Sequence, residues 1–281
     1  MKRRQNATYA SIAPHSLTPL GLLTLAACGG GGGSSPSVSS SGSSTVSGNA
    51  VAGPIDGAVA FVDYDEDGVL DIADEPYAYT GSDGGFSLTS TDADAPIVVT
   101  TDSATAGGLS VSAIDTSSDT SLSGITLKAP NGSTVVSPTS TVAYDLIKTN
   151  GLTEAQVATA LGLDGVSILS FNPYASGVDA STALAVEKVA SQVMTTVKAV
   201  AAAAEGAGAN GEDSANLAFA SLVAEVQQKA AAGSSFDLTN ASDLNALETK
   251  INANFATASG IDATAFNTIL DTAMSSVKLV N

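Results

Sequence analysis

The sequence predicts an α+β fold in two domains, with a small antiparallel β-sandwich over residues 50–136 and an all-α helical bundle over residues 137–281. In the first region, short apolar runs rich in Val, Ile and Phe are separated by clusters of Asp, Gly, Ser and Pro, which is typical of short strands joined by turns. After Ser137-Pro138, apolar residues recur at spacings of three and four and alanine becomes the dominant residue, which indicates helices. At roughly 140 residues, the helical region is long enough to bury a core of its own.

Residues 1–27 are expected to be an export signal that is not part of the fold. The basic segment Lys2-Arg3-Arg4 precedes a short apolar stretch, residues 17–27, which stops at the lone cysteine Cys28. This stretch is well short of the ~20 residues that an α-helix needs to cross a bilayer. A membrane span is therefore not expected.

The tetrapeptide Leu25-Ala26-Ala27-Cys28 resembles the lipobox of bacterial lipoproteins, in which a cysteine follows a leucine and two small residues. The resemblance implies that Cys28 becomes the acylated first residue and anchors the chain to a membrane. Gly29 resembles the residue found at this place in lipoproteins of the outer membrane, so we expect a lipid-anchored envelope protein that is periplasmic or surface-exposed. The alternative is an ordinary leader, cut after a small-x-small site.

Residues 28–49 are predicted to be a flexible tether. After Cys28 they are almost wholly Gly, Ser, Pro, Val and Thr, beginning with a run of glycines, and this composition cannot supply a packed core. A Gly/Ser coil of about 21 residues has a root-mean-square span of roughly 25 Å, which is enough to lift a domain off a membrane surface.

Charge and composition exclude several classes of function. Three of the ten basic residues lie in the leader and all 28 acidic residues lie beyond it, so the mature chain carries 7 − 28 = −21 charges. Such a chain repels nucleic acid, whose phosphates are bound mainly by Lys and Arg. The only histidine, His15, is lost with the leader, so Ser-His-Asp triads, Cys-His pairs and His/Cys metal sites cannot form. Carboxylate and carbonyl oxygens remain, and these are the ligands suited to calcium.

The β-region is divided by turn signals. Asn131-Gly132 favours a hairpin, because both central positions of a type I′ turn require a positive φ, and Ser82-Asp83-Gly84-Gly85 is interpreted in the same way. The predicted strands are residues 57–63, 86–89, 96–101, 109–114 and 125–136, the last broken by the turn.

The helical region has clear apolar stripes. The longest predicted helix, residues 179–205, carries valines at positions 186, 189, 193, 197 and 200 on one face. Thr153 and Gln156 form a capping-box pattern at the start of a shorter helix, and Gly151 and Gly162 lie where helices commonly end. Two shorter helices are predicted over residues 139–149 and 153–161. Three further helices are predicted from apolar stripes, which are Phe219, Leu222, Val223 and Val226; Leu244, Leu247, Ile251 and Phe255; and Phe266, Ile269, Leu270, Ala273 and Val277.

The stretch that begins at Asp63 predicts a calcium loop. It places carboxylates at loop positions 1, 3, 5, 9 and 12 and Gly68 at position 6, which matches the ligand spacing of an EF-hand-type loop. The flanks argue against a true EF-hand, because a strand precedes the loop and Pro76 follows it. The alternative is a solvated acidic turn. The candidate ligands are Asp63, Asp65 and Asp67, the backbone carbonyl of Val69, Asp71 directly or through water, and Asp74 or Glu75 as the closing ligand.

Two segments resemble the calcium-loop β-sandwich repeats of bacterial surface proteins, akin to SdrD B-type and carboxypeptidase-regulatory-like domains. They are residues 57–76, with the acidic loop, and residues 80–88, with an Asp-Gly-Gly-Phe strand start. The resemblance implies a calcium-stiffened stalk or display module. The family usually has glutamate at loop position 12 directly before proline, whereas Asp74 stands at position 12 here and Glu75-Pro76 follows.

These observations favour a non-enzymatic envelope lipoprotein that acts in surface display, adhesion or envelope assembly, with other envelope or surface proteins as partners. One alternative is a binder of a small apolar ligand or a partner helix, through space between the helices. Another is a polysaccharide hydrolase that uses a carboxylate pair. The absence of tryptophan and an aromatic content of 5% leave little to stack on sugar rings, which disfavours the hydrolase.

Overall fold

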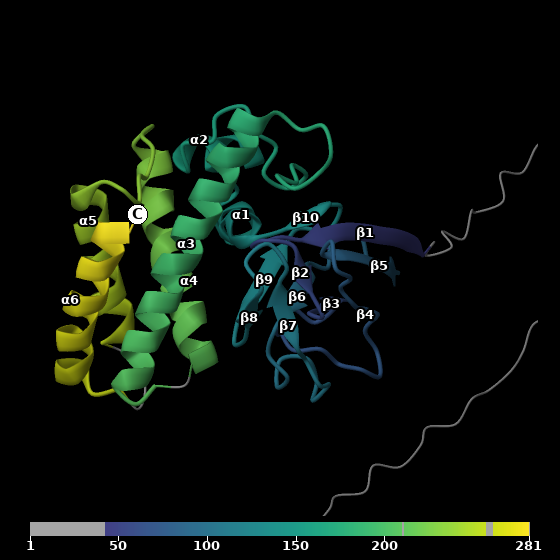
Figure 1. Cartoon of the computed structure of the whole chain (residues 1–281), viewed down its shortest axis with the longest axis horizontal. Helices are drawn as coiled ribbons and strands as arrows, with labels where there is room; N and C mark the ends of the chain where they lie inside the picture. Colours follow the sequence, from purple (N-terminus) through teal and green to yellow (C-terminus); the bar gives the residue numbers. More distant parts are fainter. Residues whose placement is uncertain (1–42, 210, 257–260, 281) are drawn as a thin grey trace, which may run out of the picture. The chain divides into compact units, whose positions relative to one another are not determined.

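The computed structural model describes residues 43–209, 211–256 and 261–280, and these belong to one compact unit. Strands come first along the chain and helices follow, so the α+β class is confirmed (Figure 1). The predicted signal peptide, Cys28 and the tether up to residue 42 lie outside the described residues.

The strands are short and form three small sheets. Their bounds are β1 (Ser44–Ala50), β2 (Ile55–Asp56), β3 (Val59–Val62), β4 (Tyr77–Tyr79), β5 (Gly85–Ser90), β6 (Ile97–Thr100), β7 (Ala113–Asp115), β8 (Thr120–Leu122), β9 (Thr126–Ala129) and β10 (Val135–Val136). The strand orders are β10-β1-β5, β2-β7-β8 and β4-β3-β6-β9. Pairing is antiparallel except between β1 and β10, which are parallel. The predicted β-sandwich and the division into two domains are not confirmed by these sheets and stay predictions.

Strand β1 begins inside the segment that was expected to be tether. Its residues pair with β5 from Ser44↔Ser90 to Asn49↔Gly85, and Val46 is buried against the core. The predicted tether boundary at residue 49 is therefore corrected to a point before Ser44. The Ser/Thr/Gly-rich sequence of β1 is held in the sheet by backbone pairing on both sides, which composition does not reveal.

The turn at Asn131-Gly132 forms, but the predicted hairpin does not. Gly132 has a φ of 85°, and the N–H of Ser133 donates to the carbonyl of Pro130 at 3.1 Å. The two flanking strands then enter different sheets, since β9 pairs with β6 and β10 pairs with β1. Tertiary pairing overrides the local hairpin signal here. Strands β2, β4 and β8 were not predicted either, because each has only two or three residues.

The sheet β4-β3-β6-β9 is covered on both faces, as the alternation of side chains along a strand allows. On β3, Ala60 and Val62 lie in the main core, whereas Val59 and Phe61 belong to a second, smaller cluster on the opposite face. Leu70, from the loop between β3 and β4, is buried in this second cluster. A loop that carries polar side chains thus also supplies part of the cover of the sheet.

The helices are close to those predicted. Their bounds are α1 (Pro138–Asn150), α2 (Glu154–Ala160), α3 (Ala180–Gly206), α4 (Gly211–Ala231), α5 (Ala241–Phe255) and α6 (Ala263–Val280). Asp179 caps α3 by accepting the N–H of Thr182, and the predicted capping box at Thr153 and Gln156 is present. Gly151, with a φ of 65°, ends α1 as expected.

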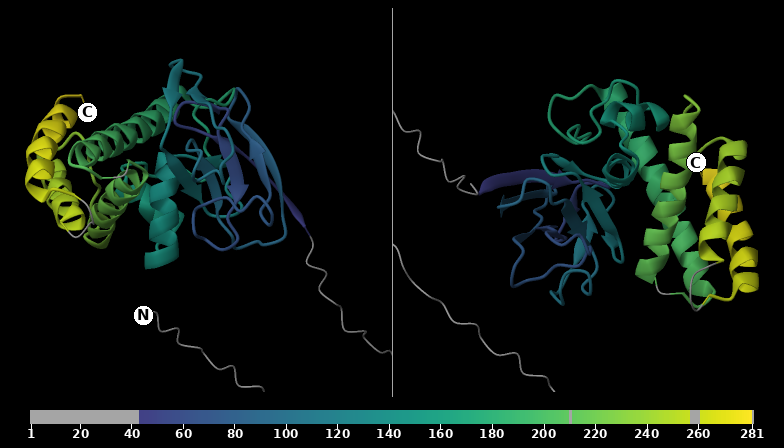
Figure 2. Two further views of the ribbon diagram at one scale, coloured as in Figure 1. Left: turned by 90° about the horizontal axis from the view of Figure 1, so that it is seen from below. Right: turned by 180° about the vertical axis from the view of Figure 1, so that it is seen from behind.

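Helix α1 connects the strands to the remaining helices. It packs on β9 and also contacts α2, α3 and α4. The buried residues Val142, Ala143 and Leu146 of α1 belong to one continuous apolar cluster that runs from the sheets into the helices. Helices α3 to α6 lie side by side, α3 against α4 and α6, and α5 against the same two (Figure 2).

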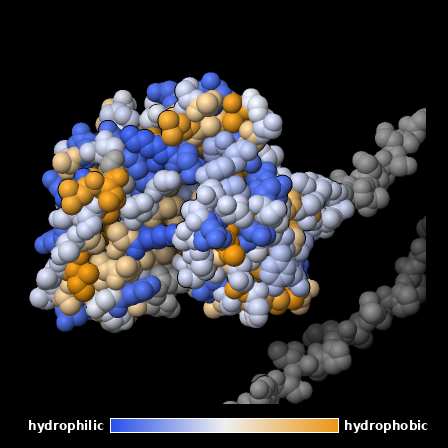
Figure 3. Space-filling view, viewed as in Figure 1, coloured by the Kyte–Doolittle hydropathy of each residue, from blue (hydrophilic) through white to orange (hydrophobic). Residues whose placement is uncertain are grey.

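The surface is mixed in character. On the face drawn in Figure 3, apolar residues form several separate groups between polar ones. None of the described helices is long and apolar enough to cross a membrane.

Candidate metal centre

The predicted ligands lie in the loop between β3 and β4. Asp63 directly follows β3, and its N–H donates to the carbonyl of Pro96 at 3.1 Å, which continues the pairing of β3 with the segment before β6. Side chains alternate along a strand, so Asp63 is on the same face as Phe61, the face that Leu70 covers. The first candidate ligand is thus held by a buried strand.

The structure brings three predicted ligands together. Carboxylate oxygens of Asp63, Asp65 and Asp67 lie within 4.8 Å of one another. Gly68, at loop position 6, has a φ of 82°, the left-handed conformation that a sharp turn requires. Asp65 accepts the N–H of Asp67 at 3.2 Å, and Asp67 accepts the N–H of Val69 at 2.7 Å, so the loop's own backbone orients both exposed carboxylates.

Asp63 is the buried member of this cluster, with no exposed surface. One oxygen, Oδ2, accepts the N–H of Gly68 at 3.0 Å, while Oδ1 is buried and has no hydrogen-bond partner among the described residues. Burial raises the pKa of Asp63 to about 6, and the nearby charge of Glu75 adds to this rise. The Gly68 N–H and the Lys128 ammonium act in the opposite direction.

A buried carboxylate oxygen without a partner is costly, and a cation coordinated by the oxygen would remove that cost. The remaining oxygens of the cluster are also of the hard type that divalent cations such as calcium and magnesium accept. The donor set therefore fits a metal ion, with Asp63, Asp65 and Asp67 as the residues that could hold it.

Glu75, and not Asp74, is the buried acid at the end of the loop. Its Oε1 accepts the N–H of Tyr64 at 2.6 Å, and its Oε2 accepts the N–H of Asp71 at 2.9 Å. Burial raises the pKa of Glu75, and the two backbone N–H groups oppose that rise. Glu75 thus joins the start of the loop to its middle.

The other predicted ligands are not part of the cluster. Asp71 and Asp74 are exposed, and neither is among the grouped carboxylates of the described chain. Val69 is 42% exposed, and its predicted ligand atom is the backbone carbonyl oxygen. Their roles stay predictions.

The sequence did not identify two lysines that lie beside this loop. Lys148, in the last turn of α1, forms an ion pair with Glu66 at the exposed rim. Lys128, on β9, lies so close to the loop that a Cβ on Gly68 would be 3.2 Å from its Nζ. Both are far from the loop in sequence. The one sequence signal that could have identified them is the scarcity of basic residues in this acidic chain.

No protein-family model, curated protein or solved structure matches this chain.

Proposed function

We propose that this chain is a non-enzymatic lipoprotein of the bacterial cell envelope whose strand region is stabilised by calcium bound to the loop of residues 63–75. It acts in surface display, adhesion or envelope assembly, anchored through the acylated Cys28. The observation that carries the proposal is the fully buried Asp63, whose Oδ1 has no partner among the described residues, at the centre of a three-carboxylate cluster.

Calcium suits this site better than most metals, because the cluster offers carboxylate oxygens in a short loop with Gly at the turn. Asp63, Asp65 and Asp67 would hold the ion, while Leu70 of the same loop covers the small apolar cluster under it. Fixing the loop would therefore also fix the cover of the sheet β4-β3-β6-β9. In this proposal the strand region is a β-sandwich module that carries the helical domain of residues 137–281.

Calcium titration of the full chain, purified in a non-ionic detergent, tests the metal site. We expect saturable binding with a Kd on the order of 0.1 to 1 mM, typical of extracellular calcium modules. At tenfold excess over Kd, the ion should stabilise the fold by about 1.4 kcal/mol. The variant Asp65→Ala/Asp67→Ala should lose both effects.

The matched control is Asp164→Ala/Asp271→Ala, which removes the same charge from exposed positions outside the loop. It should bind calcium as the wild type does. Equal loss of binding in both double variants would mean that total charge, and not the loop, attracts calcium. No saturable binding up to several millimolar, the weak end for such loops, would leave a solvated acidic turn.

The lipid anchor has its own test. Cells that express the chain are labelled with radioactive palmitate, and Cys28→Ser is compared with the wild type. We expect the label and the membrane association to be lost in the variant. Cys28 is the sole cysteine, so a label that persists in the variant would sink the acylation proposal.

Binding of a small apolar ligand is a second candidate function, favoured by a groove between α2 and α4. The groove has a volume of about 290 Å³ and is lined mainly by small residues, among them Ala155, Ala160 and Ala230. This volume is just below the range of roughly 300 to 1,000 Å³ that is typical of ligand pockets. Native mass spectrometry of the chain from its source would detect a co-purified ligand, and a clean apo mass would count against binding.

A further inference from the structure

Lys128 lies on the same face of its sheet as Asp63. The register pairs Phe61 with Val98 and Val98 with Lys128, and directly paired residues share a face. Asp63, two residues after Phe61, continues that face. The sheet thus places one lysine two strands away from the buried acid of the candidate metal centre.

The side chain of Lys128 extends to the loop itself. A Cβ on Gly68 would lie 3.2 Å from Lys128 Nζ and 3.9 Å from its Cε, so the ammonium is directly over loop position 6. The N–H of the same Gly68 donates to Asp63 Oδ2 at 3.0 Å. The Lys128 ammonium therefore lies beside the glycine whose N–H binds the Asp63 carboxylate.

The backbone of Lys128 is fixed by the first turn of α1. Its N–H donates to Thr141 Oγ1 at 3.0 Å, and its carbonyl accepts from Ser140 Oγ at 2.8 Å. The backbone of β9 is thereby held on both sides of the residue, by β6 in the sheet and by these hydroxyls. The stem of Lys128 thus starts from a fixed position beside the loop.

We propose that Lys128 is the resident counter-charge of the aspartate cluster and the residue that sets the cluster's affinity for a divalent cation. This inference rests on the proposed calcium site. Without the ion, one positive charge partly compensates Asp63, Asp65 and Asp67. With the ion, the same charge repels it, and because Coulomb energies scale with the product of the charges, the repulsion of a divalent ion is about twice that of a monovalent one at equal distance.

Two consequences distinguish Lys128 from an ordinary surface lysine. It keeps the loop folded when calcium is scarce, and it holds the affinity down, so that the loop responds to the millimolar concentrations outside cells and not to traces. Lys148 has the same charge but pairs with Glu66 at the rim, where both side chains are more than 40% exposed. It should contribute little to affinity, because solvent screens exposed charges.

The test compares four versions of the full chain in non-ionic detergent: wild type, Lys128→Gln, Lys128→Arg and Lys148→Gln. Calcium binding is measured by calorimetry, and thermal melting is measured in calcium-free buffer. We expect Lys128→Gln to bind calcium at least about tenfold more tightly, since one nearby positive charge is removed. We expect Lys128→Arg and Lys148→Gln to stay within about twofold of the wild type.

Melting without calcium gives an independent readout. Lys128→Gln should melt about 2–4 °C below the wild type, as expected for the loss of one modest charge interaction in a domain of this size, and Lys128→Arg should restore the wild-type value. Lys128→Met serves as a second neutral variant, should Gln disturb the packing.

The outcomes separate the two proposals. A wild type that binds calcium, together with a Lys128→Gln variant of unchanged affinity, would overturn the role of Lys128 and leave the calcium site in place. No binding by any version would overturn the proposed calcium site and, with it, the affinity role. An equal increase in calcium affinity in Lys128→Gln and Lys148→Gln would show that the net charge of the protein sets the affinity, and it would count against a specific role of Lys128.

Discussion

Asp63 and Glu75 are both buried acids of the same loop, but their oxygens have different partners. Glu75 uses both oxygens to accept backbone N–H groups, from Tyr64 and Asp71. Asp63 uses only Oδ2 in this way, and its Oδ1 has no partner among the described residues. At the scale of single residues, Glu75 therefore organises the backbone of the loop, and Asp63 is the acid whose Oδ1 an ion would bind.

Glu75→Ala should destabilise the protein even without calcium. The change leaves two N–H groups without their acceptor, so we expect a loss of about 2–4 kcal/mol in the free energy of unfolding. Asp74→Ala, one residue earlier and exposed, is the control and should cost less than about 0.5 kcal/mol. Urea titration in calcium-free buffer measures both. Equal losses would show that Glu75 does not have this structural role.

Calcium affinity should fall as the pH is lowered, because Asp63 must lose its proton to bind the ion. Its pKa is raised to about 6, so binding near pH 6 should release a fraction of a proton. Well below that pKa, affinity should weaken by up to about tenfold per pH unit. Calorimetry in buffers of different ionisation enthalpy measures the protons released. An affinity that stays constant from about pH 7 to about pH 5 would contradict a raised pKa of Asp63.

The calcium-free protein should show the opposite dependence. The folded-state pKa of Asp63, about 6, lies above the ordinary value of 3.8, so the folded state holds the proton more tightly than the unfolded chain. The stabilising contribution of that proton is complete below about pH 4 and is lost as the pH rises through about 6. We expect Asp63→Asn, which cannot ionise, to reduce the fall in melting temperature between these pH values.

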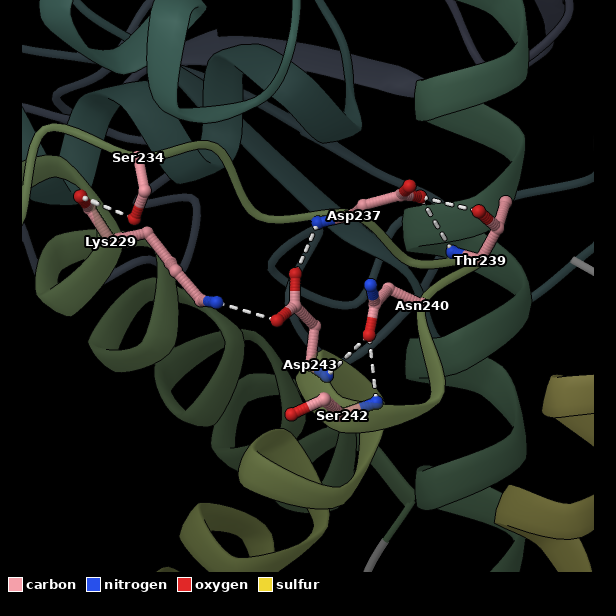
Figure 4. Close-up of polar contacts among 7 residues, drawn as sticks. All are labelled: Lys229, Ser234, Asp237, Thr239, Asn240, Ser242 and Asp243. Atoms are coloured by element: carbon pink, nitrogen blue, oxygen red, sulfur yellow. Dashed lines mark hydrogen bonds and ion pairs between the residues drawn. The ribbon is translucent and has the colours of Figure 1, made fainter.

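At the scale of elements, the connection between α4 and α5 is held by polar contacts, of which those of Asp243 are partly buried (Figure 4). Lys229, in the last turn of α4, pairs with Oδ1 of Asp243 at 2.5 Å, and Oδ2 of Asp243 accepts the N–H of Asp237 at 2.9 Å. The two side chains of the pair are only 23% and 10% exposed. Asp243 therefore joins the end of one helix, the connecting segment and the start of the next.

Asp243→Ala should cost about 1–3 kcal/mol of stability, because it leaves both the Lys229 ammonium and the Asp237 N–H without their acceptor. Lys148→Met, at the exposed pair with Glu66, is the comparison and should cost less than about 1 kcal/mol. Urea unfolding followed by far-UV circular dichroism measures both. A larger effect for Lys148→Met would contradict the importance of burial at Lys229 and Asp243.

The elements that the sequence predicted correctly are those whose signals are local. The capping box at Thr153 and Gln156 and the helix end at Gly151 each depend on residues a few positions apart. The strand β1 was not predicted, because its fate depends on pairing with β5, some forty residues later.

The candidate site shows the same division. The spacing of Asp63, Asp65 and Asp67 predicted their meeting, because they lie in one short loop. The spacing of ligands in an EF-hand-type loop could not predict that Glu75 is buried and Asp74 exposed. Which of the two is buried depends on how the chain enters β4. The approach of Lys128 could not be predicted either, because it requires β6 to pair with both β3 and β9.

At the scale of the whole molecule, the apolar cluster passes from the sheets through α1 into the helices. A shared core couples the parts that it joins, so we expect one cooperative melting transition, in which tyrosine fluorescence and far-UV circular dichroism change together. Leu146→Ala, at a fully buried position of α1, should cost about 2–5 kcal/mol of stability. It should lower the melting temperature seen by the two probes by the same amount. Two separate transitions would instead support independent domains that meet at residues 136 and 137.

The position of β1 also decides how the protein would bear tension. If Cys28 is acylated as proposed, any pull between the membrane and a partner of the helices enters the fold at Ser44 and draws β1 along its own axis. The strand is paired on one side with β5 and on the other with β10, which leads directly into α1. The hydrogen bonds on both sides would then be loaded in shear, many at once, instead of opening one after another. Strand β1, which composition assigned to the tether, is thus the part of the fold best placed to resist a pull from the membrane anchor.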